Sequence, residues 1–469
     1  MGCEPVGVPG RPCDLPGCAA STDPYVSFAR LVSQVKRQEE DSMRFIGLDV
    51  HRDFCEVAIS EGGKARRAGR VAARPAELEL FAQSLASDDR VVLEATGNAL
   101  AIARILAPHV GEVVLAHARK VRAIAEAKVK TDAIDACTLA ELLAAGLVPR
   151  VWIGDETTRL LRRLVSRRRQ LVKESTRAKN EIPAVLLRTL QGRPPVSDVF
   201  GKAGRAWLAA LELGIDERET VEAGLRQLDF LQGELGRVDR AIAERALGSA
   251  EIRRLMTIPG VDVTTAATLM ATIGDVARFP SPRQLVGYIG LDPKLRQSGV
   301  SKPRHGRISK EGSAAARHAL VEAAWSAAKT PGPLCAFAER IAARRGRHIA
   351  AVAVARKLAV LAWHLLTRGE DYAYQRPSVV RRKLRRLELK AGAPRAKRQA
   401  GSAPLWGSRH QDELERELVR QAELAYRRLV IDWQRTQPKD GAGATPGRAS
   451  SRPSKRQAAR QDSAPRPAL

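Results

Sequence analysis

Four carboxylates occupy positions where an acid is costly unless it binds a cation. Asp49 and Glu94 each lie in a short apolar segment that has the pattern of a buried strand. Asp132 and Asp135 are three residues apart on an expected helix, so their side chains leave one face with Cβ atoms about 5–6 Å apart. Oxygen ligands suit Mg²⁺, and two such ions about 4 Å apart can stabilise the attacking and leaving oxygens of a phosphodiester. The four acids therefore predict metal-dependent phosphoryl transfer.

Each acid also has an ordinary structural interpretation. Asp132 would serve as the N-cap of its helix, Asp135 would be solvated, and Glu94 would pair with an arginine. Taken singly, these roles are at least as common as catalysis. Taken together, acids on a first strand, a central strand and a closing helix favour a shared metal site. The neighbouring His51 and Asp53 are interpreted as structural residues.

The elements that would position these acids form a mixed α/β domain over 43–150. The pattern indicates three hairpin-like strands, with a Gly-Gly turn between the second and third, followed by alternating helices and strands. The expected strands are 45–50, 54–60, 66–72, 90–94 and 112–116, and the expected helices are 77–85, 100–106 and 132–145. This layout is that of an RNase H-like (RuvC-like) fold.

The charge balance points to a polyanionic partner. The 469 residues include 79 Lys and Arg against 52 Asp and Glu, which gives a formal net charge of +27. Nucleic acid is the commonest polyanion that such a surplus serves. A solvated basic surface is the alternative, and part of the surplus does lie in a low-complexity tail. Charge therefore favours nucleic acid without deciding the matter.

Cysteine spacing and hydropathy argue against other classes of protein. The six cysteines form no CxxC pair, no Cys/His cluster with zinc spacing and no disulfide framework. No apolar run looks long enough to span a bilayer, and the N-terminus lacks a signal pattern. We expect a soluble protein of a reducing cytoplasm, without a membrane partner.

The second expected region, 151–250, is helical and strongly basic near its start. Apolar residues recur at near-heptad spacing, which indicates a coiled coil. The arginines expected to contact nucleic acid are Arg162, Arg163, Arg167, Arg168 and Arg169. Such a helix suits a phosphate backbone, or a helical hairpin that pairs with a partner chain. A solvated coiled-coil face is an equally good interpretation.

The third expected region, 251–375, is a mostly α-helical domain that begins with a Pro259-Gly260 turn. A turn of this kind before a helix resembles a helix–hairpin–helix, which directs backbone N–H groups at phosphate, so Gly260 is a candidate nucleic-acid contact. An ordinary packing corner is the commoner structure for such a turn taken alone. The expected helices include 264–273 and the Ala-rich segment 349–366.

A basic loop in this third region carries three serines. Ser298, Ser301 and Ser309 lie among cations, and composition alone does not choose between them. A Ser-Gly pair is usually only a turn. A cationic setting could hold a scissile phosphate and stabilise its developing charge. The cations expected to contact nucleic acid are Lys294, Arg296, Lys302, Arg304, Arg307 and Lys310, with His305 among them.

The two ends of the chain differ from the rest in composition. Residues 1–42 are rich in Gly, Pro and small residues, and Met43 directly precedes the first expected strand, so a disordered, dispensable extension is expected. Residues 376–469 are expected to form a basic, largely disordered tail with one amphipathic helix. The apolar face of that helix would carry Leu414, Leu418, Ala425 and Leu429.

Three sequence runs resemble the DEDD transposases of bacterial insertion sequences, the IS110 family, whose N-terminal domain is related to Holliday-junction resolvases. They are Ile46-Gly47-Leu48-Asp49-Val50-His51, Leu93-Glu94-Ala95-Thr96-Gly97-Asn98 and Lys130-Thr131-Asp132-Ala133-Ile134-Asp135-Ala136. The third region is similar to the C-terminal domain of that family at Ile258-Pro259-Gly260, Leu285-Val286-Gly287-Tyr288-Ile289-Gly290-Leu291, Gln297-Ser298-Gly299, Gly306-Arg307-Ile308-Ser309-Lys310 and Val354-Ala355-Arg356-Lys357-Leu358. The likeness covers roughly residues 44–370.

The resemblance implies roles for particular residues. Asp49, Glu94, Asp132 and Asp135 would bind Mg²⁺, and Ser298 occupies the position of a serine that completes a composite active site. It also implies DNA partners, namely the element ends and the target, and a structured guide RNA. A homo-oligomer, either a dimer or a tetramer, is expected as well.

Two other functions compete with a transposase. A junction resolvase would cut DNA with water and metal, without a covalent step, but the second domain and the Ser-Gly motif disfavour it. A nucleic-acid-binding protein with an inactive nuclease fold is disfavoured because all four acids are present. DNA flanking the reading frame that folds into a stem-loop RNA would favour the transposase.

Overall fold

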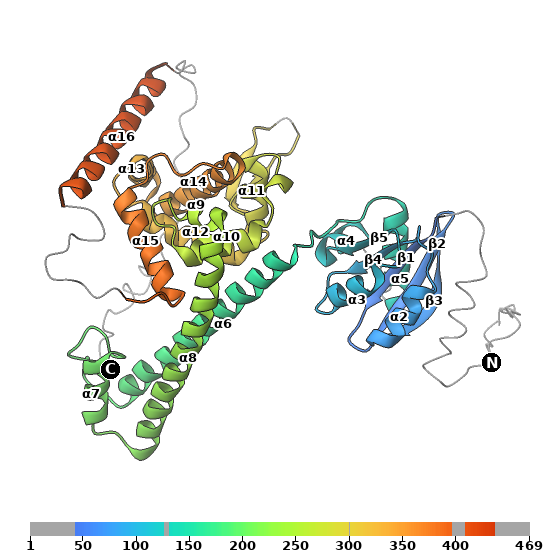
Figure 1. Cartoon of the computed structure of the whole chain (residues 1–469), viewed down its shortest axis with the longest axis horizontal. Coiled ribbons are helices and arrows are strands. Elements are labelled where there is room, and N and C mark those ends of the chain that lie inside the picture. Colours follow the sequence, from blue (N-terminus) through green and yellow to red (C-terminus); the bar gives the residue numbers. More distant parts are fainter. Residues whose placement is uncertain (1–42, 126–130, 300, 396–408, 437–469) are drawn as a thin grey trace, which may run out of the picture. The chain divides into compact units, whose positions relative to one another are not determined.

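The computed structural model describes residues 43–125, 131–299, 301–395 and 409–436 (Figure 1). The chain splits into two compact units, of which the first ends at Gly154 and the second begins at Asp155. The expected extension 1–42 and the end of the expected tail, 437–469, lie outside the described residues.

The first unit is built on a five-stranded sheet in the order β3-β2-β1-β4-β5. Strands β1 (Phe45–Val50), β2 (Phe54–Glu61) and β3 (Lys64–Ala72) form an antiparallel meander, and β4 (Arg90–Glu94) and β5 (Glu112–Ala116) add in parallel beside β1. Positive φ angles at Gly62 and Gly63 make the tight β2–β3 turn possible. The mixed sheet confirms the predicted α/β unit and is consistent with an RNase H-like fold.

The two faces of the sheet are covered by different helices. Helices α2 (Pro75–Gln83) and α3 (Ala99–Leu106) pack with the β1 side chains Ile46, Leu48 and Val50 in one core. Helix α5 (Asp132–Ala144) packs on the opposite face, where it shares a second core with β4 and β5. A short helix, α4 (Ala118–Ile124), follows β5 and was not expected from the sequence. Alternation along β1 therefore turns Asp49 toward the α5 face.

Close approach of α5 to β1 depends on a glycine. A Cβ atom at Gly47 would lie 2.1 Å from the carbonyl oxygen of Ala136 and 2.7 Å from the backbone nitrogen of Ala140. No side chain therefore separates strand and helix at this point, and α5 lies directly on β1. This contact fixes the distance between the first turn of α5 and the edge of the sheet.

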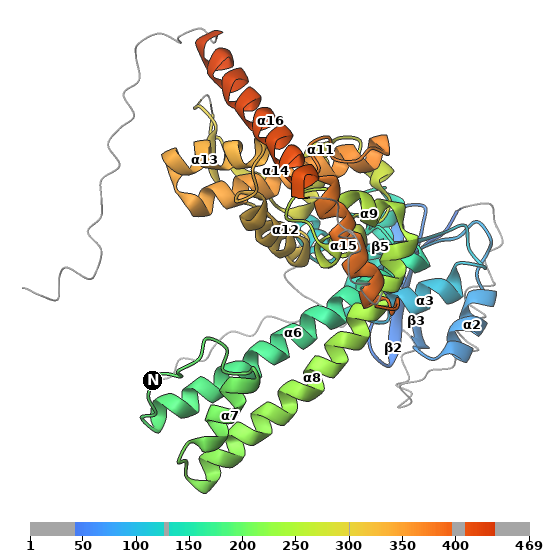
Figure 2. The ribbon, with the colours of Figure 1, turned by 60° about the vertical axis from the view of Figure 1, so that its left-hand side comes forward.

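The second unit begins with a long helical hairpin (Figure 2). Helices α6 (Glu156–Arg188) and α8 (Ile215–Gly248) lie side by side, and α7 (Lys202–Ala210) packs with both of them in a small core near the hairpin end. The Asp155 side chain caps α6 by accepting a hydrogen bond from the Thr158 backbone at 3.1 Å. The predicted helical region is thus present as a hairpin.

A helical bundle forms the rest of the second unit. It comprises α9 (Ala250–Leu255), α10 (Val263–Ile273), the 3₁₀ turn η1 (Val276–Arg278), α11 (Pro282–Ile289), α12 (Ala314–Ala327), α13 (Pro333–Arg345) and α14 (Arg347–Arg368), with a hairpin of β6 (Pro293–Arg296) and β7 (Arg304–Ile308). Helix α14 is 22 residues long and apolar enough to cross a membrane by length and composition, so the expectation that no run is long enough was wrong. Its Val354, Ala355 and Leu358 are buried in the bundle core, which explains the apolar composition.

Two further helices follow α14 in the chain. Helix α15 (Pro377–Lys390) packs into the bundle core through Leu387, so that core extends past the predicted boundary at 375. Helix α16 (Arg409–Thr436) coincides with the expected amphipathic helix. Its contact with the bundle includes buried Val419 and Glu415, whose carboxylate accepts hydrogen bonds from Ser378. The expected apolar face is exposed instead, at Leu414, Leu418 and Leu429.

Candidate active site

Two of the four acids lie at one edge of the sheet because β1 and β4 are parallel neighbours. Leu48 is paired with Leu93, and Asp49 and Glu94 are the residues that follow them. Asp49 is buried and Glu94 is half-buried. The carboxyl ends of the two strands therefore bring both side chains to the same edge.

The other two acids lie in the first turn of α5. Thr131 is the N-cap of this helix, because its side chain accepts a hydrogen bond from the Ile134 backbone at 3.3 Å. The alternative role of Asp132 as the cap is therefore wrong. Asp132 and Asp135 are both half-buried in this turn, and α5 holds them on the face of the sheet that Asp49 occupies.

Electrostatic interactions connect the other three acids with Asp49. Burial raises the pKa of Asp49, because it disfavours the charged form, and His51 acts in the opposite direction. The carboxylates of Asp135, Asp132 and Glu94 each raise the pKa of Asp49 further. Like charges around a buried carboxylate are costly unless a cation lies among them.

His51 lies within this group, although the sequence interpretation made it structural. Its Nε2 is 3.2 Å from Oδ2 of Asp49 and 3.3 Å from Oδ2 of Asp132. The spacing Asp-x-His at the end of a strand was the available signal, since it places both side chains at the same edge. Asp53 is exposed in the same loop.

A fifth acid on this face, Glu56, is not available for a cation. It is paired with Asp49 across the β1–β2 ladder and is fully buried. Its carboxylate accepts hydrogen bonds from the guanidinium groups of Arg67 and Arg70, which neutralise it.

The side chains present at the edge fit a divalent cation. Asp49, His51 and Asp132 each offer one ligand atom, and these atoms all lie within 4.8 Å of one another. Carboxylate oxygens are the ligands that hard cations prefer. The excess negative charge around Asp49 gives a cation a favourable place to bind.

The serine-bearing loop lies in the second unit, between β6 and β7. The Ser301 hydroxyl donates to the Ser298 carbonyl at 2.6 Å, and the Ser309 hydroxyl donates to Asp292 at 2.6 Å. Ser298 is exposed, and its hydroxyl has no partner within the described part of the chain. Of the three serines, Ser298 is therefore the one whose hydroxyl is not engaged by those residues.

The cations of this loop are exposed around the serine. They form no ion pair with any acid in the described ranges, so their charge is free to meet a polyanion. The set comprises Lys294, Arg296, Lys302, Arg304, Arg307 and Lys310, while the side chain of His305 lies outside the described residues.

Comparisons with known proteins match segments of both units of the chain. A family model for DEDD transposases of the IS110 type matches residues 46–190, and one described as the transposase IS116/IS110/IS902 family matches residues 252–337. A putative transposase, y4qE, of Sinorhizobium fredii is 30% identical over 291 residues, which are 60% of this chain and 71% of that protein. The chain belongs to the IS110 family of DEDD transposases. Members of this family cleave DNA and transfer its strands, so this chain is an enzyme that acts on DNA.

Two further relatives bear on the extent of the IS110 likeness. The transposase for insertion sequence element IS1111A of Coxiella burnetii is 28% identical over 351 residues, which are 72% of this chain and 93% of that protein. A pilin gene-inverting protein of Moraxella lacunata is 39% identical over 66 residues, which are 14% of this chain and 20% of that protein. The IS1111A transposase thus matches the IS110-family chain over most of its own length.

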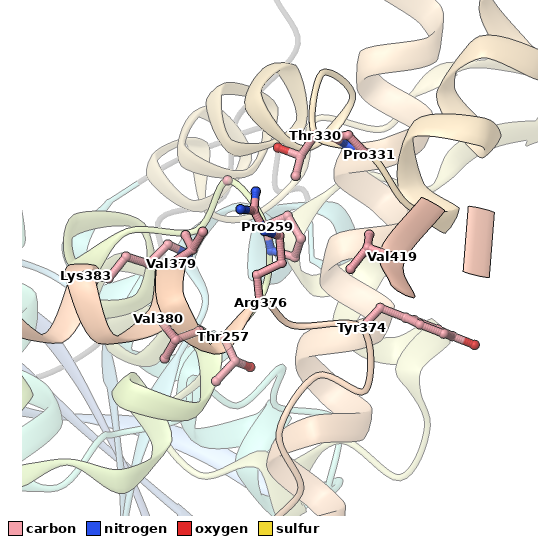
Figure 3. Close-up of a pocket in the computed structure, with 11 residues that line it drawn as sticks. Thr257, Pro259, Thr330, Pro331, Tyr374, Arg376, Val379, Val380, Lys383 and Val419 are labelled. Atoms are coloured by element: carbon pink, nitrogen blue, oxygen red, sulfur yellow. The ribbon is translucent and has the colours of Figure 1, made fainter. Parts of the chain in front are cut away.

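The Pro259-Gly260 turn of this IS110-family transposase packs inside the bundle. Gly260 has φ +80°, and a Cβ there would lie 2.2 Å from the Ala323 carbonyl oxygen of α12. The Lys383 ammonium of α15, whose pKa burial lowers to about 8, lies beside the turn, as Figure 3 shows. It donates to the carbonyl oxygens of Met256, Ile258 and Val261 at 2.6, 2.9 and 2.8 Å. These contacts favour the packing corner, and a nucleic-acid contact at Gly260 stays a prediction.

The arginines of α6 divide into two groups. Arg162 donates to the Ala271 carbonyl of α10 at 2.6 Å, and Arg168 pairs with Asp239 of α8 at 2.6 Å. Both side chains are engaged within the second unit, so the expectation that they contact nucleic acid is disfavoured. Arg163, Arg167 and Arg169 lie toward the solvent side of the helix, and Arg163 pairs with Glu156 of the same helix at 3.0 Å.

This division predicts different effects on DNA binding. Changing Arg163, Arg167 and Arg169 together to Gln should weaken binding and flatten its dependence on salt, by about 1 in log–log slope for each phosphate that is no longer neutralised. Titrations of labelled DNA at several salt concentrations measure that slope. Arg168→Gln is the matched control, and it should keep the slope while loosening the hairpin. Equal slopes for the triple variant and the parent would show that α6 does not meet phosphate.

Proposed function

We propose that this transposase moves its insertion sequence by Mg²⁺-dependent DNA cleavage and strand exchange, with Ser298 as nucleophile and a structured RNA as guide. The convergence of Asp49, Glu94, Asp132 and Asp135 carries the proposal. Like charges gathered on a strand edge and a helix are unfavourable for the fold alone, so they favour a site that functions with a cation.

The carboxylates would hold Mg²⁺ and fix its position at the carboxyl edge of the sheet. When bound, the metal supplies Lewis acidity toward a phosphodiester and lowers the pKa of an oxygen that it contacts. Asp49 would be the most constrained of the four acids, because it is the most buried. Asp132 and Asp135 would take their spacing from one helical turn.

Ser298 would attack the scissile phosphorus and keep the energy of the broken bond. The new bond joins Ser298 Oγ to phosphorus, and the bond from phosphorus to the leaving strand breaks. The serine proton passes to a base, and the leaving oxygen takes up a proton to become a hydroxyl end. The exposed cations Lys294, Arg296 and Arg304 would hold the phosphate and offset its developing charge. The strand-end hydroxyl of a second DNA would reverse the step and complete the exchange.

Several surfaces would serve the proposed partners. The +27 charge would meet DNA at the element ends and target, together with the guide RNA. The α6–α8 hairpin would form a coiled coil with another subunit, giving a dimer or a tetramer. Exposed apolar residues on and beside its helices, Leu187, Leu190, Ile215 and Phe230, support that role. The protein would act in the bacterial cytoplasm at the nucleoid.

Hydrolysis by a resolvase is the second candidate function. It would use the same acids without Ser298. The name of the pilin gene-inverting relative favours recombination over simple cutting, because inversion requires rejoining. Simple binding by an inactive nuclease fold is disfavoured by the intact set of acids.

Metal dependence gives the direct test of the proposed site. Mg²⁺ at about a hundred times its Kd should raise the free energy of unfolding of the first unit by about 2.7 kcal/mol, provided that only the folded state binds it. Thermal unfolding with MgCl₂ or with EDTA measures the gain. The double variant Asp132→Asn, Asp135→Asn should show no gain, and labelled DNA should remain uncut in EDTA. Full cleavage in EDTA would contradict the proposal.

A further inference from the structure

The imidazole of His51 joins two acids that come from different elements. Its Nε2 lies 3.2 Å from Asp49 at the end of β1 and 3.3 Å from Asp132 at the start of α5. The three ligand atoms lie within 4.8 Å of one another, which is the spacing of donors around a single ion. His51 is therefore placed to be a ligand itself as well as a neighbour of the acids.

Neighbouring groups hold this ring in place. It stacks on Phe54, with the ring centroids 4.8 Å apart and an angle of 28° between the ring planes. The Arg70 guanidinium lies 4.4 Å from the Phe54 centroid, and its Nε donates to the fully buried Glu56 at 2.5 Å. A chain of contacts thus runs from buried Glu56 through Arg70 and Phe54 to His51.

The backbone of His51 is held as well. Its N–H donates to the Phe54 carbonyl at 2.9 Å, and its carbonyl accepts from the Asn98 side chain at 2.8 Å. Asn98 follows the strand that ends in Glu94, so it links the loops after β1 and β4. A ring that is stacked on one face, with its backbone held by two hydrogen bonds, loses little freedom on binding a ligand, which favours metal coordination.

We propose that His51 is a ligand of the divalent-metal site, together with Asp49 and Asp132, and that it gives this site a preference for Mn²⁺ over Mg²⁺. The proposal rests on the proposed metal site of this transposase. Imidazole nitrogen is a good ligand for transition metals, whereas Mg²⁺ prefers oxygen ligands and keeps its water. A mixed set of two carboxylates and one imidazole therefore discriminates between the two ions.

Metal binding by the full chain tests this proposal without any DNA. Mn²⁺ and Mg²⁺ are titrated separately into the parent and into His51→Ala, with calorimetry for both ions and the electron paramagnetic resonance signal of free Mn²⁺ as a second measure. The parent should bind Mn²⁺ at least about tenfold more tightly than Mg²⁺. His51→Ala should lose about tenfold or more in Mn²⁺ affinity and less than about threefold in Mg²⁺ affinity. Equal losses for the two ions, or no loss, would overturn the ligand role.

A spectroscopic signature separates ligation from mere proximity. Electron spin-echo modulation of the Mn²⁺-loaded parent should show coupling to one directly bound ¹⁴N, and His51→Ala should lack it. His109→Ala is the matched control, because His109 pairs with Glu79 at 2.9 Å outside the acidic group. The control should keep both the coupling and the parent affinity. A loaded parent without ¹⁴N coupling would refute the proposal.

A third variant distinguishes failure of this proposal from failure of the proposed metal site. Asp49→Asn should abolish binding of both ions, because it removes the most buried carboxylate of the site. If it does so while His51→Ala behaves like the parent, the metal site stands and His51 is not a ligand. If Asp49→Asn binds both ions like the parent, the metal site itself is elsewhere. Thermal unfolding of each variant without metal verifies that it is folded.

Discussion

Ser298→Ala is expected to retain DNA and RNA binding but to lose strand cleavage by roughly 10⁶-fold, the scale on which removal of a serine nucleophile acts. A serine hydroxyl is a weak nucleophile at neutral pH and needs activation by a base or a metal. In this chain Ser298 is exposed among cations, and its hydroxyl is not engaged by the described residues. No hydrogen bond to those residues therefore has to break before the hydroxyl attacks. The parent should also form a covalent protein–DNA adduct that Ser298→Ala lacks.

A denaturing gel of protein mixed with labelled element DNA, guide RNA and Mg²⁺ measures both products. Ser301→Ala is the closest control, because it removes a hydroxyl three residues away that donates to the Ser298 carbonyl. It should cleave DNA and form the adduct. Ser309→Ala should do the same, with some loosening of the loop because its hydrogen bond to Asp292 is removed. Normal cleavage by Ser298→Ala, with no adduct from the parent, would assign the reaction to hydrolysis.

Asp49→Asn should lower cleavage by at least about a thousandfold, since loss of metal-based stabilisation is worth several kcal/mol. The same change should raise thermal stability in the absence of metal. Burial raises the pKa of Asp49 above its unfolded value, so the folded state binds this proton more tightly. Ionisation of Asp49 therefore lowers the free energy of unfolding once the pH rises above about 4, the pKa of Asp in the unfolded chain. Asn does not ionise, so the variant does not lose this stability.

The stability gain should consequently grow with pH from about 4 upward and vanish below it. Thermal unfolding in EDTA across this range measures the gain, and a cleavage assay measures the loss of activity. Asp53→Asn removes the same charge from an exposed position in the adjacent loop, so it should change neither quantity. Full activity of Asp49→Asn would exclude that carboxylate from the chemistry.

Apolar alternation and helix periodicity were sufficient to predict the sheet and the places of the four acids. The pattern worked because Ile46, Leu48 and Val50 face one core while the intervening residues face another. The place of His51 beside the acids was not predicted, because it depends on the approach of α5. That approach is a contact between segments about eighty residues apart. The β6–β7 hairpin was also not predicted, because most of its residues are exposed and show no apolar alternation.

The packing of the C-terminal helices was not predicted, for a different reason. Helix α15 is rich in arginine and buries Leu387 and Ser378, so composition suggested a tail where the bundle continues. On α16 the apolar stripe was correctly placed on a helix, yet the contact with the bundle is partly polar, through Glu415 and Glu423. A buried carboxylate that accepts backbone hydrogen bonds leaves no hydrophobic signal in a sequence.

Gly47 contacts the backbone of α5 directly, with no side chain between them. A substitution at this position would therefore disturb the site, although Gly47 takes no part in the reaction. A single methyl group there would move a whole helix, and with it two of the four acids. A damaged copy of such an element is most readily recognised by a missing catalytic residue. A substitution at Gly47 could therefore inactivate this family member while all four carboxylates are still present. The presence of the four acids in a sequence is then not enough to show that a copy of the element is mobile.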